Sequence, residues 1–403
     1  MTGNAHRGIW HLGVLIFPVG LPPGGVPRRL RGKSLAASPK GRDFVSPLLT
    51  ASPYHTMDPS EPRATASNRR NTFTETLHGR AVLVTGGAGF VGSSTVVRLL
   101  KMGARVTVLD DFFTGLEDNL PRNADSLVVV RGSVTDEEVV RKYVHAAEFV
   151  FHMAARNIIV STKNPREDFA TNIGGTLNVL MAARDSDVRR VVYTSSASVF
   201  GNPQSLPINE DDRTSMLSPY AVSKYGGENY CNAFFESYGV PVTAVRYSNV
   251  YGPMQRPDNP YCGVVAKFFA AAMSGEAPVI HGDGEQTRDY TFIDDAVEAT
   301  ILAAVTPRAE GQTYNVGTGR ETSVNQLAAT IVRIAGSQLP PRHIDRRDID
   351  NIRRRVLNIE KARRELRWVP EITLEHGLRA THEWLRRTEP KGIDAAAPGQ
   401  PAI

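Results

Sequence analysis

Short apolar runs alternate with longer amphipathic stretches through the middle of the chain. The apolar runs are at residues 81–84, 105–109, 127–130, 149–151, 191–193 and 242–245. The helical stretches lie between them, at residues 94–102, 137–144, 169–183 and 221–238. Strands that alternate with helices predict a parallel sheet covered by helices on both faces. The sequence therefore predicts the α/β fold class, with a doubly wound parallel sheet.

The pattern changes at both ends of the chain. Residues 1–76 have no sustained periodicity and are rich in Pro, Gly, Ser, Thr and Arg, so we predict a disordered basic tail. We assign the sheet to residues 77–250, with a return segment near 290–318. Looser, Pro- and Gly-rich segments and a basic helical end at 360–387 predict a smaller C-terminal substrate lobe over 251–388, and a loose tail follows over 389–403.

Charge and composition mainly argue against certain classes of protein and site. The formal net charge is +5, but residues 1–76 carry ten Lys and Arg against four Asp and Glu, which leaves −1 for the rest. A nearly neutral body does not predict nucleic-acid binding. No run approaches the roughly 18 apolar residues that span a bilayer, so no membrane association is expected. The two cysteines imply no disulfide framework and fit a cytoplasmic protein, and no cluster has metal-ligand spacing.

A glycine-rich turn joins the first apolar run to the first helix. Gly86, Gly89 and Gly92 follow the predicted strand directly and open the helix. Glycines there permit a tight turn and let backbone N–H groups approach a pyrophosphate at the helix N-terminus. The second strand ends in Asp110, whose carboxylate can accept both hydroxyls of an adenine ribose and would repel a 2′-phosphate. The sequence therefore predicts a Rossmann-type sheet that binds NAD.

A tyrosine and a lysine are four residues apart in a predicted helix. Tyr220 and Lys224 therefore lie on one helical face. A tyrosine with an ordinary pKa of about 10 is a poor base at neutral pH, but a nearby ammonium stabilises its phenolate. Such a base is needed to deprotonate a hydroxyl while hydride leaves the same carbon. The spacing alone is common in helices, and it gains weight here from the glycine turn and the serine cluster 194–198 that precede it.

These motifs together resemble the extended short-chain dehydrogenases/reductases, in the branch of NAD-dependent nucleotide-sugar epimerases and dehydratases. The similarity extends over residues 80–386 and includes the segments 85–92, 151–155, 171–176, 246–253, 282–290 and 314–317. The resemblance implies a UDP-sugar or related nucleotide-sugar substrate and a homodimer. It implies a cofactor site made of Gly86, Gly89, Phe90, Val91, Gly92, Asp110, Ala154, Asn172, Tyr220 and Lys224.

The resemblance also implies roles on the substrate side. Ser196 would share the substrate oxygen with Tyr220, and Asn249 and Arg288 would hold the diphosphate. Arg346 or Arg347 is a further candidate for that diphosphate. One departure is Ser133, which stands where the family usually has an aspartate that contacts the adenine amino group. We expect His152 and Cys231 to be packed in the core rather than catalytic.

The residues after Ser196 separate the possible reactions. Family dehydratases need an Asp-Glu pair there to eliminate water, and family UDP-glucuronate decarboxylases usually place a glutamate two residues after the catalytic hydroxyl. This chain has Ala197 and Ser198. The resemblance therefore favours transient oxidation at C4 and return of the hydride to the opposite face. That reaction is the 4-epimerisation of a UDP-hexose or UDP-hexuronate.

Other features leave alternatives open. The segment 109–115 is similar to its counterpart in decarboxylases, and the run Arg353–Arg355 and Arg156 place cations near the expected sugar site. Arginines there can bind a carboxylate, although a solvated surface or a diphosphate contact explains them equally well. UDP-glucuronate decarboxylation to UDP-xylose or its 4-keto form is therefore the alternative. A non-catalytic NAD-binding regulator is a third hypothesis, and the presence of Ser196, Tyr220 and Lys224 argues against it.

Overall fold

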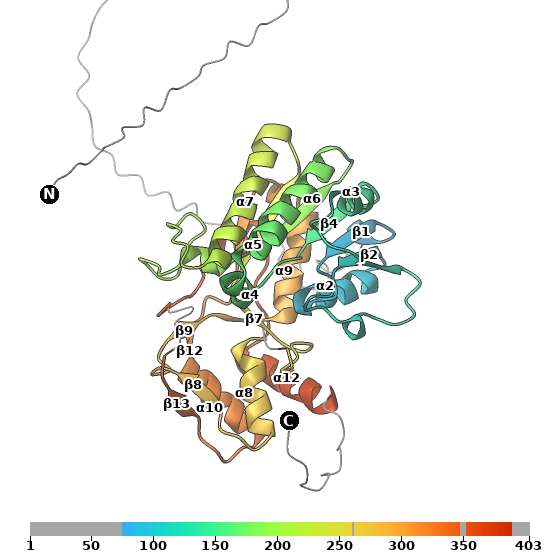
Figure 1. The fold of residues 1–403 in the computed structure, drawn as a ribbon. Helices are drawn as coiled ribbons and strands as arrows, with labels where there is room; N and C mark the ends of the chain where they lie inside the picture. The colour runs from blue at the N-terminus through green and yellow to red at the C-terminus, as the bar shows by residue number, and fades with distance from the viewer. Residues whose placement is uncertain (1–74, 260–261, 347–351, 389–403) are drawn as a thin grey trace, which may run out of the picture. The chain divides into compact units, whose positions relative to one another are not determined.

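Seven parallel strands form the central sheet of the computed structural model, which describes residues 75–259, 262–346 and 352–388 (Figure 1). The strand order is β11-β6-β5-β4-β1-β2-β3. The strands are β1 (Ala81–Thr85), β2 (Arg105–Asp110), β3 (Leu127–Arg131), β4 (Phe149–His152), β5 (Arg190–Ser196), β6 (Val242–Tyr247) and β11 (Thr313–Val316). This order confirms the predicted doubly wound sheet. It reverses between β1 and β4, which is where sheets of this kind bind ligands.

Apolar side chains of the strands divide between two clusters, one on each face of the sheet. On β1, Val82 and Val84 belong to one cluster and Leu83 to the other, because successive side chains point to opposite faces. The cluster of Val82 includes residues of α2 (Phe90–Lys101) and α9 (Ile293–Val305). The other includes residues of α3 (Glu137–His145), α6 (Gly175–Arg184) and α7 (Pro219–Tyr238). The helices thus cover both faces, as predicted.

Helix α7 begins two residues before its predicted start at residue 221. Ser218 is its N-cap, with its hydroxyl 3.2 Å from the N–H of Ala221, and Pro219 occupies the first turn, where no N–H is needed. The helix ends at Gly239, which has a left-handed conformation (φ +69°). Tyr220 is therefore fixed in the first turn of a capped helix.

Two predicted helices differ in the structure. The stretch 169–183 begins as a π-helix, η2 (Phe169–Gly174), before α6 continues it. The basic end at 360–387 is divided into α11 (Glu360–Glu365) and α12 (Leu374–Thr388). Pro370 lies between the two, and proline has no N–H to continue a helix.

The C-terminal segments contribute short strand pairs and three packed helices. Strand β8 (Val279–His281) pairs with β13 (Arg342–Ile344), β7 (Asn249–Tyr251) with β10 (Tyr290–Phe292), and β9 (Thr287–Arg288) with β12 (Thr322–Ser323). Helices α8 (Val264–Met273), α10 (Val324–Ala335) and α12 gather beside β8 and β13 in Figure 1. The remaining elements are η1 (Glu117–Asn119), α4 (Ile158–Lys163), α5 (Pro165–Asp168), η3 (Ala197–Phe200) and η4 (Pro307–Ala309).

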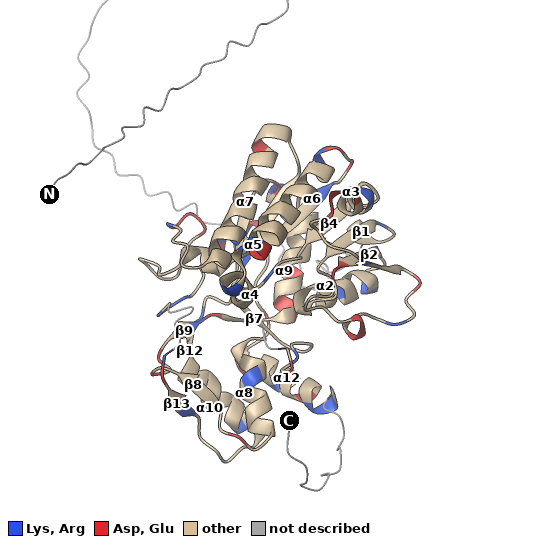
Figure 2. Ribbon diagram, in the orientation of Figure 1, with Lys and Arg blue, Asp and Glu red and all other residues tan. Residues whose placement is uncertain are grey.

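The predicted boundaries at residues 77–250 and 251–388 stay a prediction. Of the two predicted tails, residues 1–74 and 389–403 lie outside the described part, and residues 75 and 76 form a helical turn with the fully buried Leu77. Basic and acidic segments are interspersed along the described chain (Figure 2). In the described residues, no helix combines the length and apolar character that a membrane crossing requires.

Candidate active site

The glycine turn lies between β1 and α2, where the strand order reverses. Gly86 has φ +68°, a conformation that favours glycine. A Cβ on Gly86 would lie 2.7 Å from Cα of Ala154, and a Cβ on Gly92 would lie 2.1 Å from the carbonyl oxygen of Gly86. Gly89 is the N-cap of α2 and offers no side chain to its first N–H groups. The turn therefore brings backbone against backbone and leaves the start of α2 able to receive an anion.

Asp110 ends β2 beside this turn. Its Oδ2 accepts a hydrogen bond from the N–H of Ala88 at 2.8 Å, and its Oδ1 accepts one from the N–H of Phe112 at 2.8 Å. Burial raises the pKa of Asp110 against the lowering effect of those two bonds. The carboxylate predicted to bind a ribose thus also holds the glycine turn in place.

A pocket with an empty volume of about 480 Å³ opens beside the turn. Its lining comes from the loops after β1, β2, β3 and β4 and includes Gly86, Gly89, Asp110, Asp111, Ala154 and Arg156. Phe90 and Val91, at the start of α2, are partly buried. A helix N-terminus for a pyrophosphate and a carboxylate for a ribose therefore lie at one pocket. These residues fit an NAD molecule.

The three predicted catalytic residues come from β5 and α7. Ser196 ends β5, and its hydroxyl makes a hydrogen bond with that of Tyr220. Burial raises the pKa of Tyr220 to about 12, and the bond with Ser196 opposes that shift. Lys224 is also buried, which lowers its pKa to about 8, and its Nζ lies 4.7 Å from the ring centre of Tyr193. The structure thus brings Ser196 and Tyr220 together and buries Lys224 one turn further along the helix, and the catalytic roles of the three residues stay a prediction.

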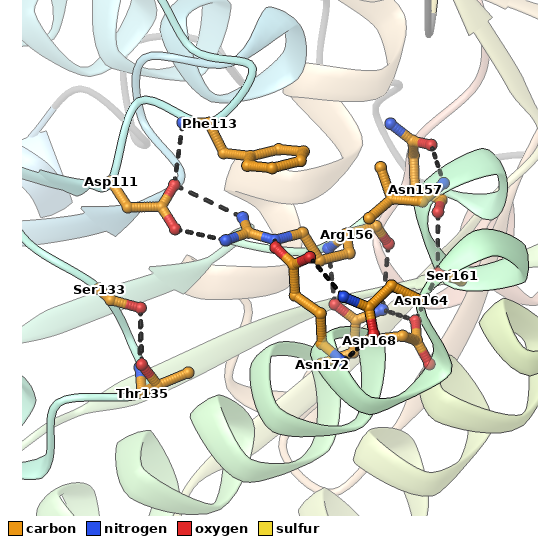
Figure 3. Close-up of polar contacts among 12 residues, drawn as sticks. Asp111, Phe113, Ser133, Thr135, Arg156, Asn157, Ser161, Asn164, Asp168 and Asn172 are labelled. Carbon is orange, nitrogen blue, oxygen red and sulfur yellow. Dashed lines mark hydrogen bonds and ion pairs between the residues drawn. The ribbon is translucent and has the colours of Figure 1, made fainter.

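Asn172 lies behind the pocket in a buried polar network (Figure 3). Its amide nitrogen donates to Asp168 Oδ1 at 2.6 Å and to Ser223 Oγ at 3.0 Å. Its amide oxygen accepts the N–H of Arg156 at 2.7 Å. Ser161 also donates to Asp168, at 2.5 Å, and burial raises the pKa of this carboxyl. Asn172 therefore supports the loop that lines the pocket, and its own contact with the cofactor stays a prediction.

Arg156 lines the pocket beside the glycine turn, and its expected place near a sugar stays a prediction. Its guanidinium contacts Asp111 at 2.7 Å and Glu167 at 2.7 Å, and its Cζ lies 4.2 Å from the centre of the Phe113 ring. Sequence reasoning missed these partners. Asp111, the acid next to Asp110, was the available signal, but the sequence does not show where its side chain points.

The predicted diphosphate residues lie on neighbouring short strands. Arg288 on β9 is buried, and its Nη1 donates to the carbonyl of Ile352 at 2.8 Å. Asn249 on β7 donates its N–H to the carbonyl of Asp289 at 2.9 Å. Arg346 is exposed, and Arg347 lies outside the described residues. Contact with a diphosphate stays a prediction for all of them.

Asp289 has a structural role that sequence reasoning missed. Its fully buried carboxylate accepts hydrogen bonds from the hydroxyl and N–H of Thr318 at 2.7 and 2.8 Å, and from the N–H of Leu357 at 3.3 Å. It therefore ties the segment after β11 to the one before α11. Its place between Arg288 and Tyr290 in a recognised motif was the available signal.

The three consecutive arginines separate in the structure. Arg353 pairs with Asp283 at 2.8 Å and Arg354 with Glu321 at 2.5 Å, and both arginines are exposed. Arg355 is buried, and its positive charge lowers the pKa of Tyr220. Only the third of the run therefore belongs to the surroundings of the catalytic tyrosine.

The other candidates are accounted for by local contacts. His152 is buried between the hydroxyls of Thr85 (2.8 Å) and Thr176 (2.9 Å), and burial lowers its pKa to about 3. Cys231 is buried in the core, which raises the pKa of its thiol. Ser133 bonds Thr135 at 2.9 Å (Figure 3). No group of three metal-binding side chains occurs within the described ranges.

Comparison with known proteins gives consistent matches. Residues 82–317 match the sequence profile of the NAD dependent epimerase/dehydratase family. The chain is 39% identical to a UDP-glucose 4-epimerase of Mycolicibacterium smegmatis over 75% of this chain and 98% of the relative. It is 33% identical to a UDP-N-acetyl-alpha-D-glucosaminuronate decarboxylase of Bacillus cytotoxicus, over 76% and 98%. It resembles the structure of a Thermotoga maritima UDP-glucose 4-epimerase with UDP-glucose, with a TM-score of 0.73, 38% identity and 76% and 99% coverage.

Proposed function

This chain belongs to the NAD-dependent epimerase/dehydratase family, and we propose that it is a nucleotide-sugar 4-epimerase acting on a UDP-hexose or UDP-hexuronate. The observation that carries the proposal is the hydrogen-bonded pair of Ser196 and Tyr220 in a fold that carries an NAD pocket. The pair can bind and deprotonate one substrate hydroxyl. The catalytic step therefore begins with a proton transfer to Tyr220.

The cofactor supports this step from the Rossmann side. We propose that Gly86, Gly89, Gly92, Phe90 and Val91 hold the pyrophosphate end and Asp110 the adenine ribose. NAD, when bound there, reversibly accepts the hydride of the carbon that is oxidised. Because Asp110 would repel a 2′-phosphate, NAD is preferred over NADP.

Tyr220 must be a phenolate to accept the O4 proton. Burial opposes this, since it raises the tyrosine pKa to about 12. The hydrogen bond with Ser196 and the charge of Arg355 both lower the tyrosine pKa. We propose that Lys224 adds a second cation, because it follows one turn along α7 and its pKa of about 8 leaves it mostly protonated at neutral pH. Ser196 shares its hydrogen bond with the substrate oxygen and fixes the O4 position. Return of the proton from Tyr220 completes the turnover.

The residues after Ser196 favour epimerisation over elimination of water. Ala197 and Ser198 are both buried and carry no acid or base near their catalytic neighbour. Elimination of water needs a proton donor and a proton acceptor at the sugar, and neither position supplies one. Oxidation at C4 followed by reduction on the opposite face needs only Tyr220 as the acid and base.

UDP-glucuronate decarboxylation is the second candidate. Arg355 favours it, because a buried arginine near Tyr220 can pair with the carboxylate of a hexuronate. The 33% identical relative named as a decarboxylase supports it as well. The absence of a glutamate two residues after Ser196 weighs against it.

A product screen tests these proposals. Purified protein is incubated with UDP-glucose, UDP-glucuronate and their N-acetyl analogues, and products are identified by proton NMR, with Tyr220→Phe as the negative control. We expect C4-inverted product from at least one sugar. Release of carbon dioxide from UDP-glucuronate would favour the decarboxylase instead. If no sugar is converted, and Tyr220→Phe leaves every property unchanged, a non-catalytic NAD-binding regulator becomes the better hypothesis.

We also propose a cytoplasmic homodimer. Both cysteines are free, which fits a reducing compartment. Helices α6 and α7 pack on the same face of the sheet, and large apolar side chains at Met181, Val222 and Tyr230 are exposed on them. A second copy that covers these side chains would remove them from water. Light scattering of the purified protein, compared with a Val222→Glu variant, tests this: the wild type should have twice the monomer mass and the variant should be closer to a monomer.

A further inference from the structure

Two loops that line the cofactor pocket are joined by one arginine. Asp111 follows β2 and Arg156 follows β4, and both line the pocket. The Arg156 guanidinium contacts the Asp111 carboxylate through Nη2 at 2.7 Å and Nη1 at 3.5 Å (Figure 3). The ion pair therefore connects opposite sides of the groove that receives the cofactor.

The loop after β2 has a second contact with the same side chain. The ring of Phe113 lies over the Arg156 guanidinium, with 4.2 Å between Cζ and the ring centre, and Phe113 itself is 43% exposed. The ring therefore packs on the guanidinium of Arg156 while part of it faces solvent. Both contacts from this loop converge on one guanidinium.

The other end of Arg156 is firmly fixed. Its Nε donates to Glu167 at 2.7 Å, and its backbone N–H and C=O are both bonded to the side chain of Asn172, at 2.7 and 3.1 Å. Asn172 is bonded in turn to Asp168 and to Ser223 of the catalytic helix α7. Arg156 thus has a buried anchor on one side and a half-buried loop on the other.

We propose that Arg156 is a positioning residue that holds the loop 111–113 closed over bound NAD and slows its dissociation. This rests on the proposed function in one respect: an enzyme that regenerates its cofactor in each turnover benefits from keeping it. Phe112 is held by Asp110 and the core, so the ion pair and the ring contact act on the side chains of Asp111 and Phe113, past which NAD must leave. Breaking those contacts therefore opens the exit without removing any group that binds the nicotinamide end.

Arg156 has a competing explanation as a direct phosphate ligand. A guanidinium has five N–H donors, and three of them are directed at Asp111 and Glu167 here. If the arginine served the phosphate instead, its bond to Asp111 would compete with that contact. Removing the Asp111 charge would then strengthen NAD binding, whereas the proposed closure predicts that it weakens binding.

The test measures NAD dissociation directly. Wild-type protein, Arg156→Lys and Asp111→Asn are each loaded with radiolabelled NAD, chased with unlabelled NAD, and sampled for retained label over time. The lysine keeps the charge but loses the two-pronged contact and much of the ring stacking. Arg122→Lys is the matched control, because Arg122 also pairs with an acid, Asp118, but both are exposed outside the pocket. Melting temperatures identify any variant that is generally destabilised.

We expect both pocket variants to release NAD about 10- to 100-fold faster than the wild type, as suits the loss of a charged hydrogen-bonded contact. The double variant should release it no faster than the worse single variant, because both changes break the same contact. Saturating NAD should restore most of the turnover. Arg122→Lys should release NAD at the wild-type rate.

Three results would overturn the proposal. They are unchanged dissociation in Arg156→Lys and Asp111→Asn, slower dissociation in Asp111→Asn alone, or additive effects in the double variant. The assay needs no sugar substrate. If the product screen fails while NAD release still accelerates as described, the proposed reaction is wrong and the role of Arg156 stands. If sugars are epimerised but the variants release NAD at the wild-type rate, the proposed reaction stands and the role of Arg156 is wrong.

Discussion

The pocket beside the glycine turn and the segments proposed to hold the diphosphate are built by different means. Around Gly86 and Gly92, backbone touches backbone so closely that a single added carbon would lie within 2.7 Å of a neighbouring main-chain atom. Around Arg288 and Arg355, the site is made of long side chains on short strands and loops. A backbone-built pocket accepts almost no substitution. A site made of side chains can change in charge and size while the fold stays the same. We therefore expect substrate specificity to change more easily than cofactor specificity.

The largest expected effect is at Tyr220, where the two regions meet. Tyr220→Phe removes the acid and base, and we expect turnover to fall roughly 10²- to 10⁴-fold, with NAD content and melting temperature unchanged. Steady-state assay on the best substrate from the product screen measures this. Tyr238→Phe, at the exposed end of the same helix, is the control and should have wild-type turnover. Retention of a tenth or more of the activity in Tyr220→Phe would assign the proton transfer to another group.

The second effect tests the backbone-built pocket. Gly92→Ala would place a Cβ 2.1 Å from the Gly86 carbonyl oxygen, so the turn must move. We expect a loss of about 3 kcal/mol in the free energy of unfolding and no detectable NAD after desalting. Denaturant titration and nucleotide analysis measure both. The control is Gly174→Ala, also in a helical segment, whose added Cβ would meet nothing closer than 3.8 Å. A Gly92→Ala protein that retains NAD would show that the turn is more adaptable than the contact indicates.

The third effect is a pH dependence of the free energy of unfolding, which arises from His152 at the end of β4. The pKa of His152 is about 3 in the folded protein and about 6.5 in an unfolded chain, so the unfolded state binds more protons between these values. His152 therefore stabilises fully above pH 6.5, and this contribution is lost as the pH falls towards 3. Between pH 7 and pH 5 the free energy of unfolding should drop by about 2 kcal/mol on this account.

Denaturant titrations at pH 7 and pH 5 check the role of His152. His152→Gln should be less stable than the wild type at pH 7, because the bonds to Thr85 and Thr176 change, and it should lack this part of the pH dependence. His145→Gln, at an exposed position, should keep the wild-type pH dependence. Equal pH dependence in wild type and His152→Gln would contradict the assignment.

The smallest effect is expected in the side-chain-built region. Arg354→Ala removes an exposed, solvent-screened pair with Glu321 and should leave the free energy of unfolding and KM close to the wild-type values. Arg355→Ala removes a buried cation near Tyr220 and should shift the pH profile of turnover to higher pH, because that charge lowers the tyrosine pKa. Identical pH profiles in the two variants would remove the distinction between these neighbours.

The sequence predicts the backbone-built part better than the rest. The strands, the glycine turn and the helix with Tyr220 all follow from local patterns: buried apolar runs, glycines at a strand end and a Ser-Pro helix start. The partners of Arg156 could not be predicted, because Asp111 is 45 residues away and the contact exists only once β2 and β4 are placed in the sheet. The different environments of Arg353, Arg354 and Arg355 could not be predicted either. Three equal side chains in sequence differ in burial only through the path of the chain between β13 and α11.

The hydrogen bonds of Asp110 have a consequence for any attempt to redesign cofactor preference. Its two oxygens hold the N–H groups of Ala88 and Phe112, so the residue that selects against a 2′-phosphate also shapes the loop that would receive one. Exchanging it for a small or basic residue would leave the buried N–H of Ala88 and the half-buried N–H of Phe112 without their acceptor. A change to NADP use in this chain therefore requires a replacement for both acceptors together with a new phosphate ligand. The path from one coenzyme to the other is closed to single substitutions.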